Sequence, residues 1–254
     1  MLRLMRSWIM SSYRDLTQLP LDKVNDLVIA CDSSAGIGKK ADDQVTIASS
    51  VMAAFTIRVP LLEFICHGVT PLAAVDTVGN EMYPTGQAVI QGIRDELAHA
   101  GFAGLSLNGS TEDNMTTQTT SVGVTLIGKL AHSDLVPATP EPLHVFQLGR
   151  PLVGDAVVAH INDIFSYDQV KAIRRFVGVQ DMLPVGSKGI AYEVNQIAKT
   201  QQHPRLTWSV GVDQQQLTTS AGPATVVIVA VRESRRLPFT DRFPELLEIG
   251  RLEV

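Results

Sequence analysis

The most informative segment of this sequence reads Asn108-Gly109-Ser110-Thr111-Glu112-Asp113-Asn114-Met115-Thr116-Thr117. It is polar and acidic, and it lies between an apolar helix pattern over residues 85–100 and an apolar strand over residues 122–127. Carboxylate oxygens are preferred ligands of Mg2+, and free backbone amides bind phosphate. We therefore expect a loop at the end of a core element that holds divalent cations and phosphates.

Three more polar clusters lie at the edges of apolar segments: residues 31–40, Glu63, and residues 76–80. Their acids include Asp32 and Asp76. Together with the first segment, they predict a carboxylate-rich nucleotide site.

The bulk composition is that of a folded protein with a sizeable core. The chain has 254 residues, of which 45% are hydrophobic and 19% charged, enough for one large domain or two small ones. The net charge is −5 and no dense basic face is visible, so we expect no dedicated nucleic-acid binder. Two cysteines are too few for a disulfide framework or a zinc site, and they fit a reducing cytoplasm.

We expect no membrane-spanning segment, because no apolar run approaches the roughly 20 residues that cross a bilayer. Residues 1–10 mix arginine with apolar residues and lack the clean apolar core of a signal peptide. They are interpreted as a docked or frayed terminal element.

Helical and strand patterns alternate along the chain, which predicts an α/β or α+β fold. A boundary is expected around residues 131–155, because residues 132–142 are polar and proline-rich and residues 149–155 form another turn. We expect an N-terminal ATP- and metal-binding domain over residues 1–135 and a smaller C-terminal α/β domain over residues 150–254.

Apolar periodicity places the individual elements. We expect a helix over residues 42–57, with Pro60 kinking it or starting a second helix over 61–67. The remaining elements are expected as strands over 26–31, 72–78, 105–107, 121–130, 143–148, 205–210 and 224–231, a turn-rich segment over 32–40, and helices over 85–100, 167–177, 190–200 and 240–249.

Five acids in the polar clusters offer oxygens to magnesium: Asp32, Glu63, Asp76, Glu112 and Asp113. Simpler roles stay open for them. Asp32 also suits an N-cap or an Asx-turn, and Asp113 a solvated loop. Glu63 lies in an apolar helix and needs a partner or an exposed edge, whereas Asp76 suits a buried, paired position in its strand.

Two glycine-rich segments are candidates for phosphate binding. Gly36-Ile37-Gly38-Lys39-Lys40 presents backbone amides and an ammonium group, although it lacks the spacing of a Walker A motif. Gly186-Ser187-Lys188-Gly189 precedes a predicted helix, and it either binds an anion or simply starts that helix. The chain has no GxSxG, HExxH or CxxC motif, so the chemistries of those motifs are not indicated.

The order of these segments over residues 26–130 resembles the aminoimidazole-ribonucleotide synthetase-like ATP-binding superfamily, which includes thiamine-monophosphate kinase, selenophosphate synthetase and hydrogenase-maturation enzymes. The segment from Asp32 to Lys39 resembles that superfamily's strand ending in Thr-Asp before a glycine turn. Glu63, followed by Gly68-Val69-Thr70-Pro71, resembles its helix acid and the turn after it. Asp76 resembles its strand aspartate.

The segment Asn108-Gly109-Ser110-Thr111 resembles the superfamily's Gly-Gly-acid-Thr loop. The resemblance implies a two-domain chain whose N-terminal sheets pair across a homodimer, an ATP site between subunits and domains, and several magnesium ions on the carboxylates. This chain departs at Glu63, where the superfamily has aspartate, and at Ser110, where it has an acid. The N-terminal glycine-rich segment is absent or very short.

Within the superfamily, residues 108–113, 183–190 and 232–238 look most similar to the α-ribazole kinases. That resemblance implies phosphorylation of the 5′-hydroxyl of α-ribazole in salvage of the lower cobalamin ligand. Selenophosphate synthetase is disfavoured, because its reactive cysteine belongs in an N-terminal glycine-rich loop whereas Cys31 ends a strand.

We therefore predict an ATP- and Mg2+-dependent kinase that acts on a small nucleoside-like alcohol. Lys188 and Asp32 are the predicted catalytic residues. The predicted magnesium ligands are Asp32, Glu63, Asp76 and Asp113. ATP contacts are predicted for Gly36, Gly38, Lys39, Asn108, Gly109, Ser110, Thr111 and Gly186. We expect a homodimer, because the strand edges of the N-terminal half need to be paired.

Three alternatives stay open. An ATP-driven dehydration or cyclisation would use the same nucleotide site. The departures at Glu63 and Ser110 suggest a regulatory protein that binds nucleotide without turning it over. A subunit of a metabolic protein without any nucleotide site is the third.

Overall fold

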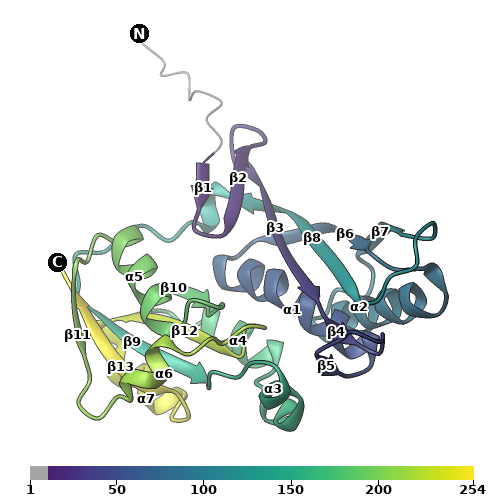
Figure 1. Cartoon of the computed structure of the whole chain (residues 1–254). Helices are drawn as coiled ribbons and strands as arrows, with labels where there is room; N and C mark the ends of the chain where they lie inside the picture. The colour runs from purple at the N-terminus through teal and green to yellow at the C-terminus, as the bar shows by residue number, and fades with distance from the viewer. Residues whose placement is uncertain (1–10) are drawn as a thin grey trace.

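The computed structural model describes residues 11–254, so the expectation for residues 1–10 lies outside its range. Two large β-sheets, one from each half of the chain, dominate the fold (Figure 1). The mixture of mainly antiparallel sheets and covering helices confirms the predicted α/β (α+β) class.

The N-terminal sheet has six strands in the order β1-β2-β3-β8-β6-β7. Neighbouring strands are antiparallel, except that β6 and β7 are parallel. The strands are β1 Ser11–Tyr13, β2 Leu16–Pro20, β3 Asn25–Ala35, β6 Thr70–Val78, β7 Ser106–Thr111 and β8 Ser121–Ala131; a separate short pair is formed by β4 Ile37–Gly38 and β5 Val45–Thr46.

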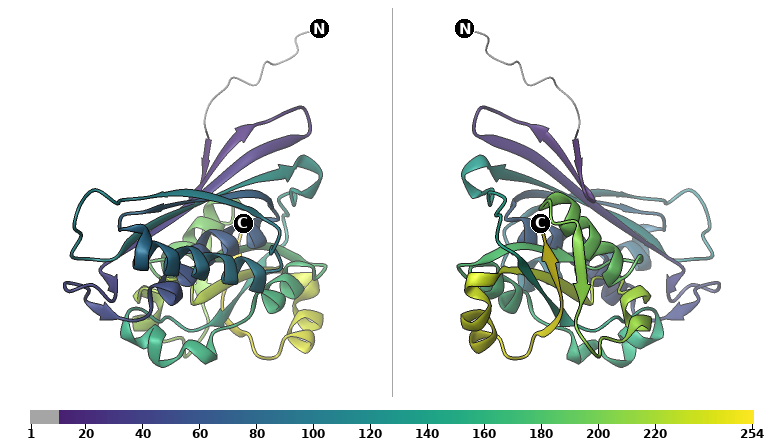
Figure 2. Two further views of the ribbon diagram at one scale, coloured as in Figure 1. Left: turned by 90° about the vertical axis from the view of Figure 1, so that its right-hand side faces the viewer. Right: turned by 90° about the vertical axis from the view of Figure 1, so that its left-hand side faces the viewer.

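Two helices, α1 Ser49–His67 and α2 Gln87–His99, lie on the same side of this sheet (Figure 2). Side chains alternate along β3, so Val28 and Ala30 are buried toward the helices while Cys31 is exposed on the other face. The helices approach closely at Gly92, where a Cβ atom would lie 2.0 Å from the carbonyl oxygen of Ser50.

The first helix differs from its prediction at both ends. It begins at Ser49 rather than near residue 42, and it continues through Pro60 to His67 as one helix. A proline inside a helix removes one backbone hydrogen bond. Here α1 packs on β3 and β8 and also contacts β10 and α4 of the second half, so burial between the two halves outweighs that loss.

Residues 42–48 are not helical because side-chain bonds hold part of them in another conformation. The Asp43 carboxylate accepts hydrogen bonds from the backbone N–H and the hydroxyl of Thr120, both at 2.7 Å. It also accepts from the backbone N–H of Lys40 at 2.8 Å. These bonds tie the segment to the end of β8 instead of allowing it to extend α1.

By length and composition, α1 is apolar enough to cross a membrane, with a mean hydropathy of 1.5 over 18 residues. It is the one such helix among residues 11–254, and it corrects the expectation that no segment is long enough. Of that window, 56% is buried inside the protein, so packing between the sheets accounts for its apolar character.

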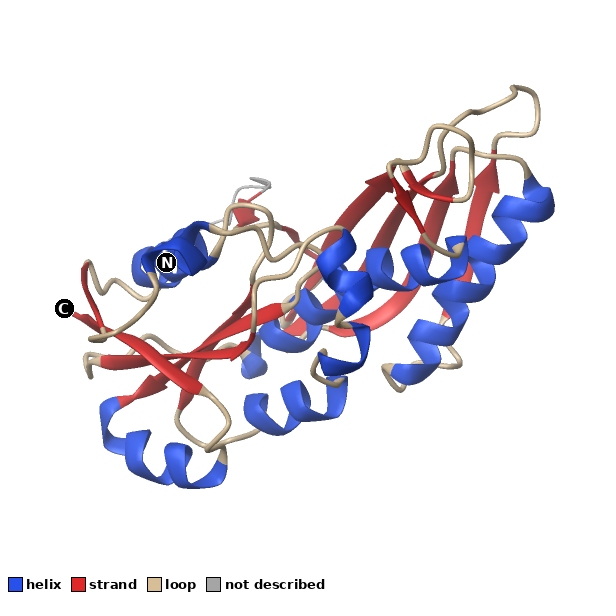
Figure 3. Cartoon of the chain, turned by 60° about the horizontal axis from the view of Figure 1, so that its bottom comes forward, coloured by secondary structure: helices blue, strands red, loops and turns tan. Residues whose placement is uncertain are grey.

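The second sheet, which lies on the left in Figure 3, has five antiparallel strands. Their order is β10-β12-β9-β13-β11. The strands are β9 Leu143–Gly149, β10 Val179–Pro184, β11 Arg205–Trp208, β12 Val226–Arg232 and β13 Leu247–Glu253. The helices of this half are α3 Asp155–Ala159, α4 Tyr167–Arg174, α5 Ile190–Thr200, α6 Gln214–Thr218 and α7 Arg236–Arg242.

The end of the chain corrects the predicted helix over residues 240–249. The helix α7 ends at Arg242, and Leu247–Glu253 form β13 between β9 and β11. Ile249 and Leu252 are fully buried there. Pairing on both sides of β13, which a local apolar pattern does not reveal, decides between strand and helix.

Candidate functional site

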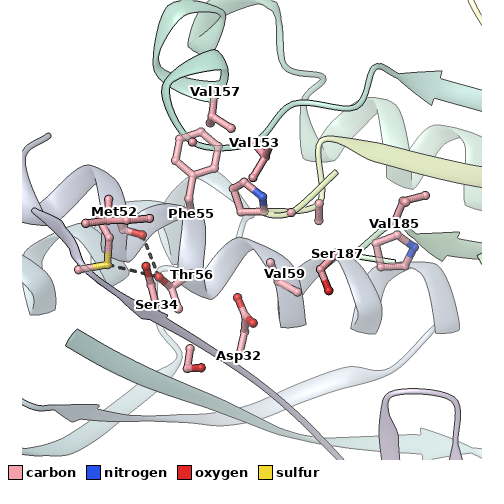
Figure 4. Close-up of a pocket in the computed structure, with 18 of the residues that line it drawn as sticks. Asp32, Ser34, Met52, Phe55, Thr56, Val59, Val153, Val157, Val185 and Ser187 are labelled. Atoms are coloured by element: carbon pink, nitrogen blue, oxygen red, sulfur yellow. Dashed lines mark hydrogen bonds between the residues drawn. The ribbon is translucent and has the colours of Figure 1, made fainter. Parts of the chain in front are cut away.

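A cleft of about 630 Å3 lies between the two halves of the chain. One wall comes from β3 and α1, and the other comes from α3, the loop between β10 and α5, and residues 222–224. Phe55, Val153 and Val157 gather at one end of the cleft, apart from the carboxylate of Asp32 (Figure 4). The cleft therefore has an apolar end and an acidic end.

Four acids from four different places in the chain line this cleft. Asp32 lies on β3, Glu63 on α1, Asp15 in the turn between β1 and β2, and Glu193 in the first turn of α5. None of them forms a salt bridge within the described part of the chain. Atom Oε2 of Glu63 is buried and has no hydrogen-bond partner among residues 11–254. The acidic end thus brings together four carboxyl groups that form no salt bridge with residues 11–254.

Burial and mutual repulsion both favour the protonated forms of these acids. Burial, with contributions from Asp15, Asp32 and Glu193, raises the pKa of Glu63 to about 8. Burial raises the pKa of Asp32 to about 6, and burial together with Asp15 raises the pKa of Glu193 to about 7. Protons or a bound cation would relieve the repulsion among these carboxylates.

Strand alternation points Asp32 toward the cleft. The ladder between β3 and β8 continues as far as Ala35, so Asp32 lies inside a strand and not at the start of the predicted turn. It projects from the same face as Val28 and Ala30, the face that α1 covers. The Asp32 carboxylate therefore reaches the cleft from the C-terminal part of β3.

The loop before α5 brings three predicted residues to the cleft: Gly186, Ser187 and Lys188. The Nζ atom of Lys188 lies 3.2 Å from the hydroxyl of Tyr192 and 4.3 Å from the centre of its ring. The hydrogen bond with Tyr192 raises the pKa of this exposed lysine. An exposed ammonium group thus lies on the cleft wall that belongs to the second half of the chain.

The other glycine segment is placed differently. Ile37 lines the cleft, but Gly36, Gly38 and Lys39 do not. A Cβ atom at Gly38 would lie 2.2 Å from Oγ1 of Thr120, so the glycine serves close packing of β4 against the end of β8. The side chain of Lys39 is exposed.

Asp76 lies on β6 and shares a strand partner with Asp32. Both aspartates pair with Val124 of β8, so they project from the same face of the sheet, two strands apart. Asp76 is 3% exposed and does not line the cleft. A Cβ atom on Gly109 would come within 2.4 Å of the Cγ atom of Asp76, so this glycine leaves room for the carboxylate.

The acidic segment that we expected as a loop begins as a strand. Residues Asn108 to Thr111 belong to β7, the edge strand, where polar side chains are tolerated because only one side of the backbone is paired. Asp113 follows on the surface and accepts hydrogen bonds from the backbone N–H of Met82 and the hydroxyl of Thr111, at 2.9 and 2.6 Å. These bonds lower its pKa. None of these residues lines the cleft.

The four predicted magnesium ligands therefore do not share one cavity within the single chain. Asp32 and Glu63 meet in the cleft, Asp76 is buried two strands away, and Asp113 is on the surface. Across residues 11–254, no three His, Cys, Asp or Glu side chains lie close enough to hold one metal ion together. Asp32 and Asp76 pair with Val124 from opposite sides, so they are separated across the sheet, and the local sequence pattern does not give this strand order.

Sequence reasoning missed Asp15 and Glu193. Glu193 had a usable signal, because it lies on the apolar face of α5 with Ile190, Val194 and Ile197 and is only 3% exposed. An acid on such a face is a candidate for a buried function. Asp15 carried no signal, since it lies in a short turn of polar residues.

Comparisons with known proteins indicate the fold. No family model matches the sequence, and no curated protein matches it. Thiamine monophosphate kinase from Aquifex aeolicus is 16% identical, with a TM-score of 0.61 over 94% of this chain and 89% of that one. The same kinase complexed with AMPPCP and TMP is 15% identical, with a TM-score of 0.61 over 95% and 85%.

PurL from Thermotoga maritima, complexed with AMPPCP, is 14% identical, with a TM-score of 0.58 over 95% of this chain. The present chain spans 38% of that protein. Structural similarity at such low sequence identity shows the fold alone. The chain has the mixed α/β fold of thiamine monophosphate kinase and PurL.

Proposed function

We propose that this protein is an ATP- and Mg2+-dependent kinase that phosphorylates a small nucleoside-like alcohol in the cleft. The observation that carries the proposal is a set of unpaired carboxylates at one end of a cleft of about 630 Å3. The structures of two proteins of the same fold are complexes with the ATP analogue AMPPCP, which supports nucleotide binding here. α-Ribazole is the first acceptor to test, on the sequence resemblance of residues 183–190 and 232–238.

The acidic end fits a magnesium ion bridged to phosphates. Magnesium in nucleotide sites is usually held by one or two carboxylates, with phosphates and water completing the octahedron. Asp32 and Glu63 supply such a pair, and the unpartnered Oε2 atom of Glu63 is the oxygen that a cation would satisfy. Bound Mg2+ would neutralise charge on the phosphoryl group during transfer.

Residues of the second half would position the reactants. Lys188 and the backbone at Gly186 would hold phosphate oxygens, and the apolar end at Phe55, Val153 and Val157 would take the flat ring of the acceptor or the nucleotide. Glu193, with its pKa raised to about 7, would accept the proton of the attacking hydroxyl. Positioning and charge neutralisation would supply most of the rate.

We also propose a homodimer that pairs the six-stranded sheets. Neither α1 nor α2 covers the second face of this sheet (Figure 2). Ile29, Val75 and Ile127 on that face are only half-buried. A second copy would cover them. Light scattering of the purified protein tests this proposal, and a monomer at micromolar concentration would contradict it.

Binding and turnover test the kinase proposal together. Calorimetry with AMPPCP should show binding that depends on Mg2+, and incubation with ATP and α-ribazole, thiamine monophosphate or a nucleoside panel should yield ADP and a phosphate ester. Absence of nucleotide binding with and without Mg2+ would end the proposal. A stable ester separates a kinase from an ATP-driven dehydratase or cyclase, which releases free phosphate.

A second candidate is a nucleotide-binding regulatory protein without turnover. It is favoured by the placement of Asp76 and Asp113, which lie outside the cleft. Mg2+-dependent AMPPCP binding with no ADP formed across the acceptor panel would support it over the kinase.

A further inference from the structure

A second cavity, which we call the linker pocket, has a volume of about 660 Å3. Residues 132–138, which lead from the first sheet to the second, form one wall. The strands β1, β2, β3 and β10 and the C-terminal ends of α1, α4 and α5 form the others. No residue of the linker pocket lines the cleft, and its volume is that of a small-molecule site.

The buried acids of the linker pocket already have partners. Asp181 lies 2.5 Å from the guanidinium of Arg14 and accepts a hydrogen bond from Gln201 at 2.9 Å. Asp26 lies 3.0 Å from Nε2 of His132. The remaining acid, Asp134, is exposed to solvent. These negative charges are therefore matched or hydrated.

The cation Arg174 is not matched. It ends α4, lines the linker pocket and is half-buried, and it forms no salt bridge with the residues that the structure describes. Its Nη2 atom would lie 3.3 Å from a Cβ atom on Gly68, the residue that ends α1, and its Nε atom is buried without a partner. A guanidinium group that is partly withdrawn from water favours an anionic partner.

The imidazole of His67 lines the same pocket as Arg174. Its ring stacks on Tyr13 with 4.8 Å between ring centres, and its Nε2 atom is buried without a partner in residues 11–254. Burial, with a smaller contribution from the positive charges of Arg14 and Arg174, lowers its pKa to about 4. His67 is therefore neutral at pH 7 and offers a polar contact without a second charge.

We propose that the linker pocket binds a small oxyanion, the carboxylate or phosphate group of a metabolite, on the guanidinium of Arg174 with the imidazole of His67 beside it. The planar guanidinium matches either group through two parallel hydrogen bonds. Arg174 belongs to the second half of the chain and His67 to the first, so the bound anion bridges the two halves.

Calorimetric titration with inorganic phosphate and, separately, with acetate tests the proposal at constant ionic strength. The wild-type protein should bind one of them, and the tighter probe identifies the group. Arg174→Gln should weaken that binding about tenfold or more, the loss expected for charge-assisted hydrogen bonds. The matched control is Arg175→Gln, which changes the exposed neighbour on the same turn and should leave the affinity unchanged.

Two further measurements keep the result specific to this pocket. Lys188→Met alters the cleft, so it should retain the Arg174-dependent binding even where nucleotide binding is lost. In the wild-type protein, phosphate or acetate should protect Arg174 but not Arg175 from phenylglyoxal, as read by peptide mass spectrometry. Equal binding by wild type and Arg174→Gln, or no protection of Arg174 by either anion, would overturn the proposal.

Discussion

The cleft and the linker pocket have almost the same volume but opposite charge balance. In the cleft, Asp32 and Glu63 have no salt bridge, and a carboxylate oxygen is buried without a partner within residues 11–254. In the linker pocket, the buried Asp181 and Asp26 are paired, and the half-buried Arg174 has no salt bridge within residues 11–254. Both cavities lie between the halves of the chain, so position alone does not distinguish them.

The difference separates structural charges from charges available to a ligand. In a buried pair such as Arg14 and Asp181 the two charges compensate each other, and removing one partner leaves the other uncompensated. The charge and the hydrogen-bonding atoms of an unpaired group in a cavity remain available to a ligand from solution. By this criterion, the cleft suits a cation bound together with nucleotide phosphates, and the linker pocket suits an anion.

The largest effect is expected from breaking the pair in the linker pocket. Asp181→Ala should lower the free energy of unfolding by about 3–5 kcal/mol, because it leaves a buried guanidinium without its counter-ion. The side chains of Arg14 and Asp181 are only 4% and 8% exposed. Urea unfolding measures the change, and Asp168→Ala, at an acid that is 93% exposed, is the control. A loss as small as that of the control would show that the pair is not structural.

The next effect concerns activity in the cleft. Asp32→Asn should reduce kcat/KM for ATP turnover about 10²–10³-fold while the thermal unfolding midpoint stays near that of the wild type, since an unpaired acid contributes to function and not to the core. Asp42→Asn changes an exposed acid of the neighbouring turn and should be neutral. Full activity of Asp32→Asn would remove this residue from the site.

The apolar end of the cleft should show a smaller and more selective effect. Phe55→Ala should raise KM for the acceptor or for ATP about tenfold, whichever ring packs there, with little change in kcat. Leu237→Ala, at a side chain that is 67% exposed elsewhere, should change neither constant. A change confined to kcat would place the reacting groups, instead of a ring, at this end.

The smallest effect is a change in how stability depends on pH. The pKa of Glu63 in the folded protein, about 8, lies above its ordinary value of 4.5, so its contribution to stability is fully present below pH 4.5 and is lost as pH rises through 8. Glu63→Gln should flatten the decline of Tm between these values and raise Tm at alkaline pH. Mg2+ should stabilise the wild type more than Glu63→Gln at pH 8. Parallel Tm profiles of the two proteins would contradict the raised pKa.

Local patterns in the sequence were enough for much of the fold. Alternation and apolar runs predicted the strands near 72–78, 121–130 and 143–148, and helical periodicity predicted the helix near 85–100, all of which are present with shifted ends. Each of these elements is set by which face of a short segment is buried. Asp32 and Glu63 were identified for the same reason, since each is an acid beside a strongly apolar run.

Elements whose state depends on distant partners were missed. Residues 108–111 are a strand because β6 offers them a parallel edge, and residues 247–253 are a strand because β9 and β11 flank them. Glu193 joins the cleft because α5 packs its apolar face inward and carries the acid with it. In each case the deciding contact lies far away in sequence.

The sequence by itself determined the class of fold, most of the strands and two of the acids in the cleft, because a buried face requires apolar residues at a regular local spacing. The tertiary structure alone decided which charges are paired. Arg14 meets Asp181 across the two halves, whereas Glu63 meets Asp15, Asp32 and Glu193, whose charges are like its own. Coulomb interactions depend on separation in space, and that separation exists only after the two sheets have closed on α1.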